Sequence, residues 1–384
     1  MEVHEGFDNV AHIKNPVITT GSFDGVHVGH KAILKRMSLL ADKINGESVL
    51  ITFYPHPRKV LYPDSYGKDL QLISTREEKI ELLKQTQLKH LILVNFTRAF
   101  SRTSSQEFVE DYLIAKLKAR MIIVGFNHHF GHNREGDYRY LLNLKKKHHF
   151  EVEEIPEHFI QNECVSSTKI RKAIQQGNIQ RANAYLDHYY IIKGNHRKER
   201  WDGSHGYGNK KEATNVKPHG PHSNTGFSET ACVDAGFSGK GFAETGCDGA
   251  GFDDNGLDDS RSSEKGIGRK RLSASASGNI MYDLTLNDEE KLIPPSGSYA
   301  VSTYFSKDKN LSDEKMFCKG IAYIINSNQH KRVCLTYLGE PQLPDQQVAL
   351  VAFRKNLWYG EWKRDNGFYK QMEQDKQQVN ELIY

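Results

Sequence analysis

Short apolar runs and amphipathic stretches alternate along the chain from Asn15 to about Lys193. Runs such as Ser48 to Phe53 and Leu91 to Val94 lie between helical patterns such as residues 29–44. Apolar runs of this length, bounded by turns and separated by helices, are typical of a parallel sheet that helices cover on both faces. We therefore predict an open α/β/α sheet, in which a ligand lies at the carboxyl ends of the strands.

The chain has 384 residues, enough for two domains with a core each. Its five cysteines are scattered without metal-ligand or disulfide spacing, which indicates a reducing compartment. We find no signal peptide and no membrane-spanning run, so we expect a soluble cytoplasmic protein with no membrane partner. The net charge is +4, and the lysines and arginines are interspersed with acidic residues, so the charge gives no reason to expect nucleic acid as a partner. No obligate protein partner is predicted.

The composition changes after Gly194, where the chain becomes polar and rich in glycine and serine. We predict a first domain over residues 1–194 and a low-complexity, disordered insertion over residues 195–281. Glycine recurs there at nearly every fifth residue from Gly226 to Gly256. This period can build a β-solenoid, but the aliphatic ladder of a solenoid core is missing, so we favour a drifted duplication without a fold.

Folding signals return over residues 282–384. Four β-branched and aromatic runs, separated by polar turns, predict an antiparallel sheet or a small barrel: residues 296–305, 318–326, 331–339 and 346–360. Residues 368–384 have a helical pattern, and we expect this helix to cover the open end or the edge of that sheet.

Two histidines stand where the strand Val17 to Thr20 gives way to a helix that starts near Val28. His27 and His30 are three residues apart, which on a helix places both imidazoles on one side of the first turn. The backbone N–H groups of that turn lack partners and favour an anion. Three glycines keep the approach open: Gly21, Gly25 and Gly29. We interpret the segment as a phosphate site. Its imidazoles, neutral or protonated, can stabilise negative charge as it moves onto a leaving diphosphate. The alternative is that one histidine caps the helix and the other packs.

A second cluster, residues 164–179, has the pattern of another anion site. Three hydroxyls precede an apolar helical face: Ser166, Ser167 and Thr168. Arg171 follows in the first turn, and Gly177 ends the helix. Capping alone would explain one hydroxyl. Three hydroxyls and a guanidinium that can bind phosphate oxygens predict two helix N-termini facing one triphosphate.

Two loops that follow strands complete the candidate site. In residues 51–61, three side chains stiffen a loop whose aromatic residues can wall a planar ligand: Pro55, His56 and Pro57. In residues 125–132, Asn127 can hydrogen-bond a base or ribose while Phe130 packs. Histidines 128, 129 and 132 allow a metal interpretation, but nothing fixes a three-ligand geometry, so a solvated or ligand-lining loop is favoured.

Four segments, GSFDGVHVGH, FYPHP, GFNHHFG and VSSTKIR, closely resemble a known family in their order and spacing. That family is the FMN adenylyltransferase (FAD synthetase) module of bacterial bifunctional riboflavin kinase/FAD synthetases, and the resemblance covers residues 15–194. It implies a Rossmann-like nucleotidylyltransferase domain that converts ATP and FMN to FAD and pyrophosphate with the help of Mg²⁺. The metal ligands are not assigned.

The resemblance also implies roles for individual residues. His27 and His30 would contact the ATP phosphates and, with Arg171, stabilise the transition state. Asn127, which stands where many relatives carry an acidic residue, would lie near the adenylate. The remaining residues of the motifs would bind nucleotide or flavin: Gly21, Phe23, Asp24, Gly29, Pro55, His56, Pro57, Phe130, Ser167 and Thr168.

The resemblance to the kinase half of that family is weaker. Between Gly194 and Asp283 we find neither its glycine-rich opening nor its P-T-A-N motif, and Arg332 stands where a catalytic glutamate would lie. A positive charge cannot act as the general base, so we expect a degenerate kinase domain with little or no riboflavin phosphorylation. Other interpretations stay open: a bifunctional enzyme with a rearranged kinase site, a non-catalytic flavin- or nucleotide-binding protein, or an H-x-G-H transferase for another phosphate ester.

Overall fold

The computed structural model describes most of the chain. The described ranges are residues 1–8, 10, 12–126, 128–156, 159–160, 163–200, 280–306, 316–327, 330–339, 341, 343, 347–360 and 366–382. The glycine-repeat segment and Asn127 lie outside them, so the predictions made for both remain untested. No helix in these ranges is long and apolar enough to span a bilayer.

The first part of the chain forms a six-stranded, all-parallel sheet in the order β1-β4-β3-β2-β5-β6. Its strands are β1 (Glu2–Glu5), β2 (Val17–Thr20), β3 (Ser48–Tyr54), β4 (His90–Asn95), β5 (Met121–Gly125) and β6 (Glu151–Ile155). This confirms the predicted α/β class. The strand order reverses between β2 and β5, and a ligand site in such sheets lies at that switch point.

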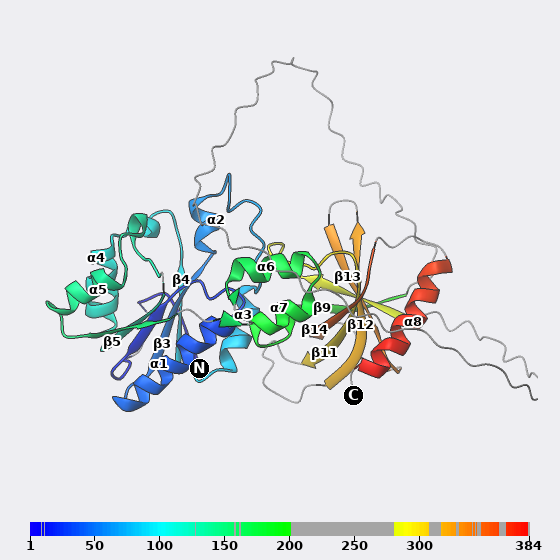
Figure 1. The fold of residues 1–384 in the computed structure, drawn as a ribbon, viewed down its shortest axis with the longest axis horizontal. Helices are drawn as coiled ribbons and strands as arrows, with labels where there is room; N and C mark the ends of the chain where they lie inside the picture. The colour runs from blue at the N-terminus through cyan, green and yellow to red at the C-terminus, as the bar shows by residue number, and fades with distance from the viewer. Residues whose placement is uncertain are drawn as a thin grey trace, which may run out of the picture. The chain divides into compact units, whose positions relative to one another are not determined.

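Helices cover both faces of the sheet (Figure 1). On one face, α1 (Val28–Lys43) and α3 (Arg76–Lys84) pack Met37 and Leu83 against the strands. On the other face, the π-helix η2 (Phe108–Lys116), which continues the short α4 (Ser105–Glu107), and α5 (Tyr138–Lys145) contribute Leu113 and Leu141. The apolar runs of the central strands are therefore buried on both sides, as the sequence pattern requires.

The edge strand β1 was not predicted, because its sequence EVHE has no apolar alternation. Its residues are mostly exposed, and it is held by parallel pairing to β4 from Glu2↔His90 to Glu5↔Leu93. A polar edge strand of this kind is stabilised by backbone hydrogen bonds rather than by an apolar face.

The second part of the chain is a closed antiparallel barrel in the order β10-β13-β12-β11-β14-β9. Its strands are β9 (Tyr190–Arg200), β10 (Ile280–Leu286), β11 (Gly297–Ser306), β12 (Met316–Ser327), β13 (His330–Tyr337) and β14 (Gln347–Tyr359). This confirms the predicted barrel. Strand β9 begins before residue 194, the predicted end of the first domain, and β10 begins before residue 282, the predicted start of the barrel domain. The domain limits themselves stay predictions.

The carboxyl-terminal helix α8 (Asn366–Leu382) lies against the outer wall of the barrel, beside β12 (Figure 1). Met372 and Val379 pack with Ala300 and Tyr323, whereas Val301, the neighbour of Ala300 on β11, belongs to the barrel's main core. Since side chains alternate between the two faces of a strand, α8 covers the outer face. The prediction that it covers an open end or an edge was wrong: a closed barrel has no edge, and α8 packs on the wall at Ala300 and Tyr323 rather than over an end.

Candidate active site

The loop that joins β2 to α1 has an unusual backbone. Phe23, Gly25 and Val26 have φ values of 46°, 81° and 43°. A positive φ suits glycine, but it is a clear outlier for a β-branched residue such as Val26. Residues in such conformations persist only where the surrounding structure holds them, and they concentrate at functional sites.

Asp24 is the residue that holds this loop in place. It is 1% exposed, and its carboxylate accepts hydrogen bonds from the backbone N–H groups of Ile73 at 3.1 Å and Ser74 at 2.9 Å. Nη2 of Arg171 donates to Oδ2 of Asp24 at 2.5 Å. Burial alone would raise the pKa of Asp24, but Arg171, Lys79 and the two N–H groups together bring it below the ordinary value. Asp24 is therefore an ionised structural anchor.

His27 and His30 lie side by side at the start of α1, as predicted. Their ring centroids are 3.7 Å apart, and the ring of Phe23 stacks on His30 at 4.4 Å. His27 is the N-cap residue of α1, yet its side chain makes no capping hydrogen bond. The Nδ1 atoms of both histidines are buried and have no partner among the described residues. This argues against the alternative in which one of them caps the helix.

Burial lowers the pKa of both imidazoles. The pKa of His27 falls to about 4, although the charge of Asp24 opposes the shift. Burial, with the nearby His27 and Lys79, lowers the pKa of His30 as well. Two neutral rings with unused nitrogens face the first turn of a helix, whose free N–H groups attract an anion. A buried polar atom without a partner is rare in folded proteins, and it points to a site that takes a ligand.

The second cluster forms α6 (Ser167–Gln175), which begins inside the predicted hydroxyl run rather than after it. Ser166 caps the helix by accepting from the N–H of Lys169 at 3.4 Å, and Gly177 ends it with a φ of 74°. Oγ of Ser167 donates to the backbone carbonyl of Asp24 at 3.2 Å. Thr168 is exposed. Asp24 thus joins the first turns of α1 and α6.

Arg171, predicted to bind phosphate oxygens through its guanidinium, also makes hydrogen bonds within the protein. Nε donates to the carbonyl oxygen of Gln71 at 2.9 Å, and Nη2 donates to Asp24. Its side chain is 11% exposed. A guanidinium has five N–H donors, so these two bonds leave others for a ligand. The structure therefore gives Arg171 a structural role beside the predicted one.

Several predicted flavin-side residues lie after β3. His56 is the N-cap of α2 (Pro57–Leu61), and its Nδ1 accepts from the N–H of Arg58 at 3.2 Å. Burial lowers the pKa of His56 to about 4, against the opposing charge of Asp24. Pro55 follows the last residue of β3, and Pro57 occupies the first helical position, where the missing N–H costs nothing.

Phe130 lies in an aromatic cluster. Its ring centroid is 6.0 Å from that of Phe108 and 6.2 Å from that of Tyr140, and its backbone pairs with Gly136. Gly21 and Gly29 lie beside the stacked rings: a methyl group added at either would touch Phe23 at 3.1 Å or His27 at 3.3 Å. Another group can therefore approach these rings closely only because both positions are glycine.

Two residues of the site carry no signal in the sequence. Lys79 is 7% exposed, and its Nζ donates to the carbonyl of Ser22 at 2.6 Å; burial lowers its pKa to about 8, although Asp24 opposes the shift. Nε2 of His188 lies 2.9 Å from the carbonyl oxygen of Gly25. Within REEKIELLK one lysine looks like another, because only the tertiary fold decides which of them is buried.

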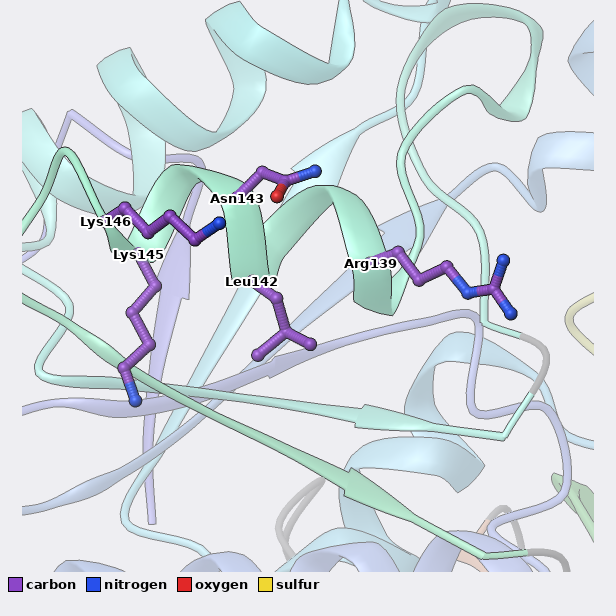
Figure 2. A pocket seen from close by; sticks show the side chains of 5 residues that line it. All are labelled: Arg139, Leu142, Asn143, Lys145 and Lys146. Atoms are coloured by element: carbon purple, nitrogen blue, oxygen red, sulfur yellow. The ribbon is translucent and has the colours of Figure 1, made fainter.

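A separate pocket contains none of the predicted residues. Figure 2 shows it along α5, where it is lined by Arg139, Leu142, Asn143, Lys145 and Lys146. In the described part of the chain, the residues that could together hold a metal ion are Glu2, His4 and His90 rather than the histidines after β5.

Comparison with known proteins supports the resemblance seen in the motifs. A family model for FAD synthetase matches residues 10–169. A bifunctional riboflavin kinase/FMN adenylyltransferase of Listeria monocytogenes is 33% identical over 180 residues, which are 47% of this chain and 56% of that protein. The chain thus matches little more than half the length of this relative. The crystal structure of a macrolide-efflux protein from Streptococcus pneumoniae has a TM-score of 0.67, 18% identity and 99% coverage of both chains, and it shows the fold alone.

One relative is matched over most of its length. An FAD synthetase of Listeria monocytogenes is 35% identical over 178 residues, which are 46% of this chain and 71% of that protein. Together with the family model, this match confirms the resemblance on which the predicted site rests. The chain belongs to the FAD synthetase family.

Proposed function

We propose that this chain is an FMN adenylyltransferase, which transfers AMP from ATP to FMN and releases pyrophosphate. This chain is a member of the FAD synthetase family, and one observation supports the proposal most. Two adjacent imidazoles at the start of α1 have buried nitrogens that find no partner among the described residues. Such nitrogens are what a bound polyphosphate would satisfy. The loop that presents them is strained, and Asp24 holds it against α6.

In the proposed reaction an oxygen of the FMN phosphate attacks the α-phosphorus of ATP in line. A new P–O bond forms, the bond between the α-phosphorus and the bridging oxygen breaks, and the electron pair leaves with pyrophosphate. The chain would position both phosphates and stabilise the charge that spreads to the leaving group. No protein nucleophile is needed.

The histidine pair suits this task because a bound phosphate can change the protonation of the two rings. Both rings are neutral in the free protein, since burial lowers their pKa values. An approaching triphosphate would raise the pKa of a neighbouring imidazole and strengthen its hydrogen bond to the leaving diphosphate. The N-terminal turns of α1 and α6 and the free donors of Arg171 would supply further stabilisation.

Magnesium is proposed to enter with ATP rather than to bind a carboxylate of this loop. The carboxylate of Asp24 accepts from two backbone N–H groups, from the hydroxyl of Ser74 and from Arg171. Its lone pairs are therefore occupied, and Asp24 does not suit Mg²⁺. The ion usually keeps several waters and binds substrate phosphates, which fits a site of this kind.

The remaining elements of the proposal concern the flavin and the barrel. We place the flavin near the loop of residues 53–57, where the side chain of Tyr54 is exposed, and Asn127 near the adenylate. The domain division at residues 194 and 281, the cytoplasmic location and the restriction of partners to ATP and FMN belong to the same proposal. Riboflavin phosphorylation is proposed to be weak or absent.

Product analysis tests the proposed activity. The full chain is incubated with FMN, ATP and Mg²⁺, and FAD and pyrophosphate are separated by chromatography; equal amounts of both are expected. Binding of ATP and FMN without turnover would favour a non-catalytic nucleotide-binding protein. Pyrophosphate release with phosphopantetheine or nicotinamide mononucleotide, but not with FMN, would instead identify a transferase for another phosphate ester.

A further inference from the structure

The edge strand β1 and its neighbour β4 bring three possible metal ligands together. In the parallel register Glu2 pairs with His90, and His4 pairs with Ile92. Residues two apart on a strand point to the same face, so Glu2 and His4 share one face of β1. Side chains that are register partners stand next to each other on one face of the sheet. The pairing thus places two imidazoles and a carboxylate side by side.

The distances among the three side chains match those of a zinc site. Nε2 of His4 lies 3.2 Å from Nδ1 of His90. Oε2 of Glu2 lies 3.8 Å from the first nitrogen and 3.5 Å from the second. The point equidistant from the corners of this triangle is about 2.0 Å from each, which is the length of Zn–N and Zn–O bonds in proteins.

A second carboxylate lies on the other side of the His90 ring. Oε2 of Glu47 is 3.6 Å from Nε2 of His90, slightly beyond hydrogen-bond length, and the same oxygen accepts from the N–H of Lys14 at 2.9 Å. Metal-binding histidines usually direct their second ring nitrogen to a carboxylate, which fixes the tautomer and leaves the other nitrogen free to ligate. His90 is 7% exposed, whereas the side chain of Glu2 is 68% exposed. An ion could therefore enter from solvent and keep a water ligand.

We propose that Glu2, His4 and His90 bind a divalent transition-metal ion, and that Zn²⁺ is the ion this ligand set suits best. Two imidazoles and one carboxylate with an open position favour zinc over Mg²⁺, which prefers oxygen ligands. The ion would tie the polar edge strand β1 to β4. The site goes beyond the proposed adenylyl transfer, because it lies at the amino ends of the strands, whereas His27 and His30 follow the carboxyl end of β2.

The alternative to a metal site is a simple hydrogen bond between Nε2 of His4 and Nδ1 of His90. The following experiment distinguishes the metal site from this hydrogen bond. The full chain is freed of metal with a chelator and titrated with ZnCl₂ by calorimetry and with CoCl₂ by visible absorption, in the absence of nucleotide. The variants are His4→Ala and Glu2→Gln, and the matched control is His149→Ala, which removes an exposed histidine.

We expect the wild type and His149→Ala to bind zinc alike and to give the absorption of tetrahedral cobalt. His4→Ala should lower the zinc affinity by about a hundredfold and Glu2→Gln by about tenfold. Zinc should raise the melting temperature of the wild type but not that of His4→Ala. Because Glu2 is exposed, Glu2→Gln tests the site even if His4→Ala folds poorly. Equal zinc affinity in wild type, His4→Ala and Glu2→Gln, or no zinc uptake by the wild type, would overturn the proposal.

Discussion

Arg171 and Asp24 form an ion pair in which Nη2 of the guanidinium lies 2.5 Å from Oδ2 of the carboxylate. The two side chains are 11% and 2% exposed. They connect the first turn of α6 to the strained loop before α1, so the positions of His27 and His30 depend on this pair. A buried pair of this kind is costly to break, because the remaining charge is left without a partner.

Asp24→Asn is expected to destabilise the protein by about 3–5 kcal/mol, since it removes the charge that Arg171 and two backbone N–H groups require. The free energy of unfolding in urea measures the loss. The matched control is Asp187→Asn, because Asp187 is 67% exposed and lies 3.1 Å from Nζ of Lys31. An exposed pair contributes about 1 kcal/mol at most. Equal losses in the two variants would contradict the anchoring role of Asp24.

His30→Ala is expected to reduce the turnover of FMN and ATP to FAD by a factor of about 10²–10³, because the ring stabilises charge that develops in the transition state. FMN affinity should change little, since the proposed contact is to the phosphates of ATP. Rates of FAD formation and FMN fluorescence titrations measure the two quantities. His149→Ala serves as the control and should leave both unchanged. A parallel fall in turnover and FMN affinity would place His30 in flavin binding instead.

The low pKa of His27 predicts a loss of stability in mild acid. Burial brings this pKa from 6.5 to about 4, so as the pH falls the unfolded chain takes up the proton first. Stability from this residue is complete above pH 6.5 and declines toward pH 4. At pH 5 the loss is about 2 kcal/mol.

Urea unfolding at pH 7.5 and pH 5 measures this effect. The stability difference between the two pH values should be smaller in His27→Gln than in wild type by about 2 kcal/mol. It should be unchanged in His149→Ala. Part of the pH dependence should remain in His27→Gln, because burial also lowers the pKa values of His56 and His128 to about 4. An unaltered difference in His27→Gln would show that this ring titrates normally.

Any side chain at Gly25 is expected to destabilise the protein. Its φ is 81°, and a Cβ atom would lie 2.7 Å from Cγ2 of Ile73. Gly6 is a matched control, with a φ of 74° and no atom within 4 Å of the added carbon. Both alanine variants lose about 1 kcal/mol from the left-handed backbone. Gly25→Ala should lose about 1–3 kcal/mol more from the overlap. Thermal unfolding compares them, and equal melting temperatures would refute a steric limit at Gly25.

Much of the fold follows from local sequence patterns, because the central strands and helices bury apolar side chains at regular intervals. The bounds of β2 and the start of α1 at Val28 agree with the prediction. Strand β1 could not be predicted, since EVHE contributes hydrogen bonds and no apolar face. The start of β9 at Tyr190 was also missed, because a barrel strand and a sheet strand look alike until their partners are known.

The candidate site was predictable where one segment carries the chemistry. His27 and His30 lie on one turn of one helix, so their spacing alone places them together. The partner of Asp24 could not be found in this way, because Arg171 is far along the chain and meets it only through packing of α6. Lys79 was missed for the same reason: its burial depends on the sheet beneath α3.

The barrel is expected to have little or no riboflavin kinase activity. Arg332 on β13 donates from Nη2 to Oδ1 of Asp283 on β10 at 3.0 Å. An arginine held in an ion pair thus occupies the position where the family resemblance expects a catalytic glutamate. A guanidinium stays protonated and cannot accept the proton of a riboflavin hydroxyl. Radiolabelled ATP and riboflavin should therefore give little or no labelled FMN, while the same preparation supplied with FMN forms FAD. Ordinary turnover of riboflavin would show that another residue of the barrel acts as the base.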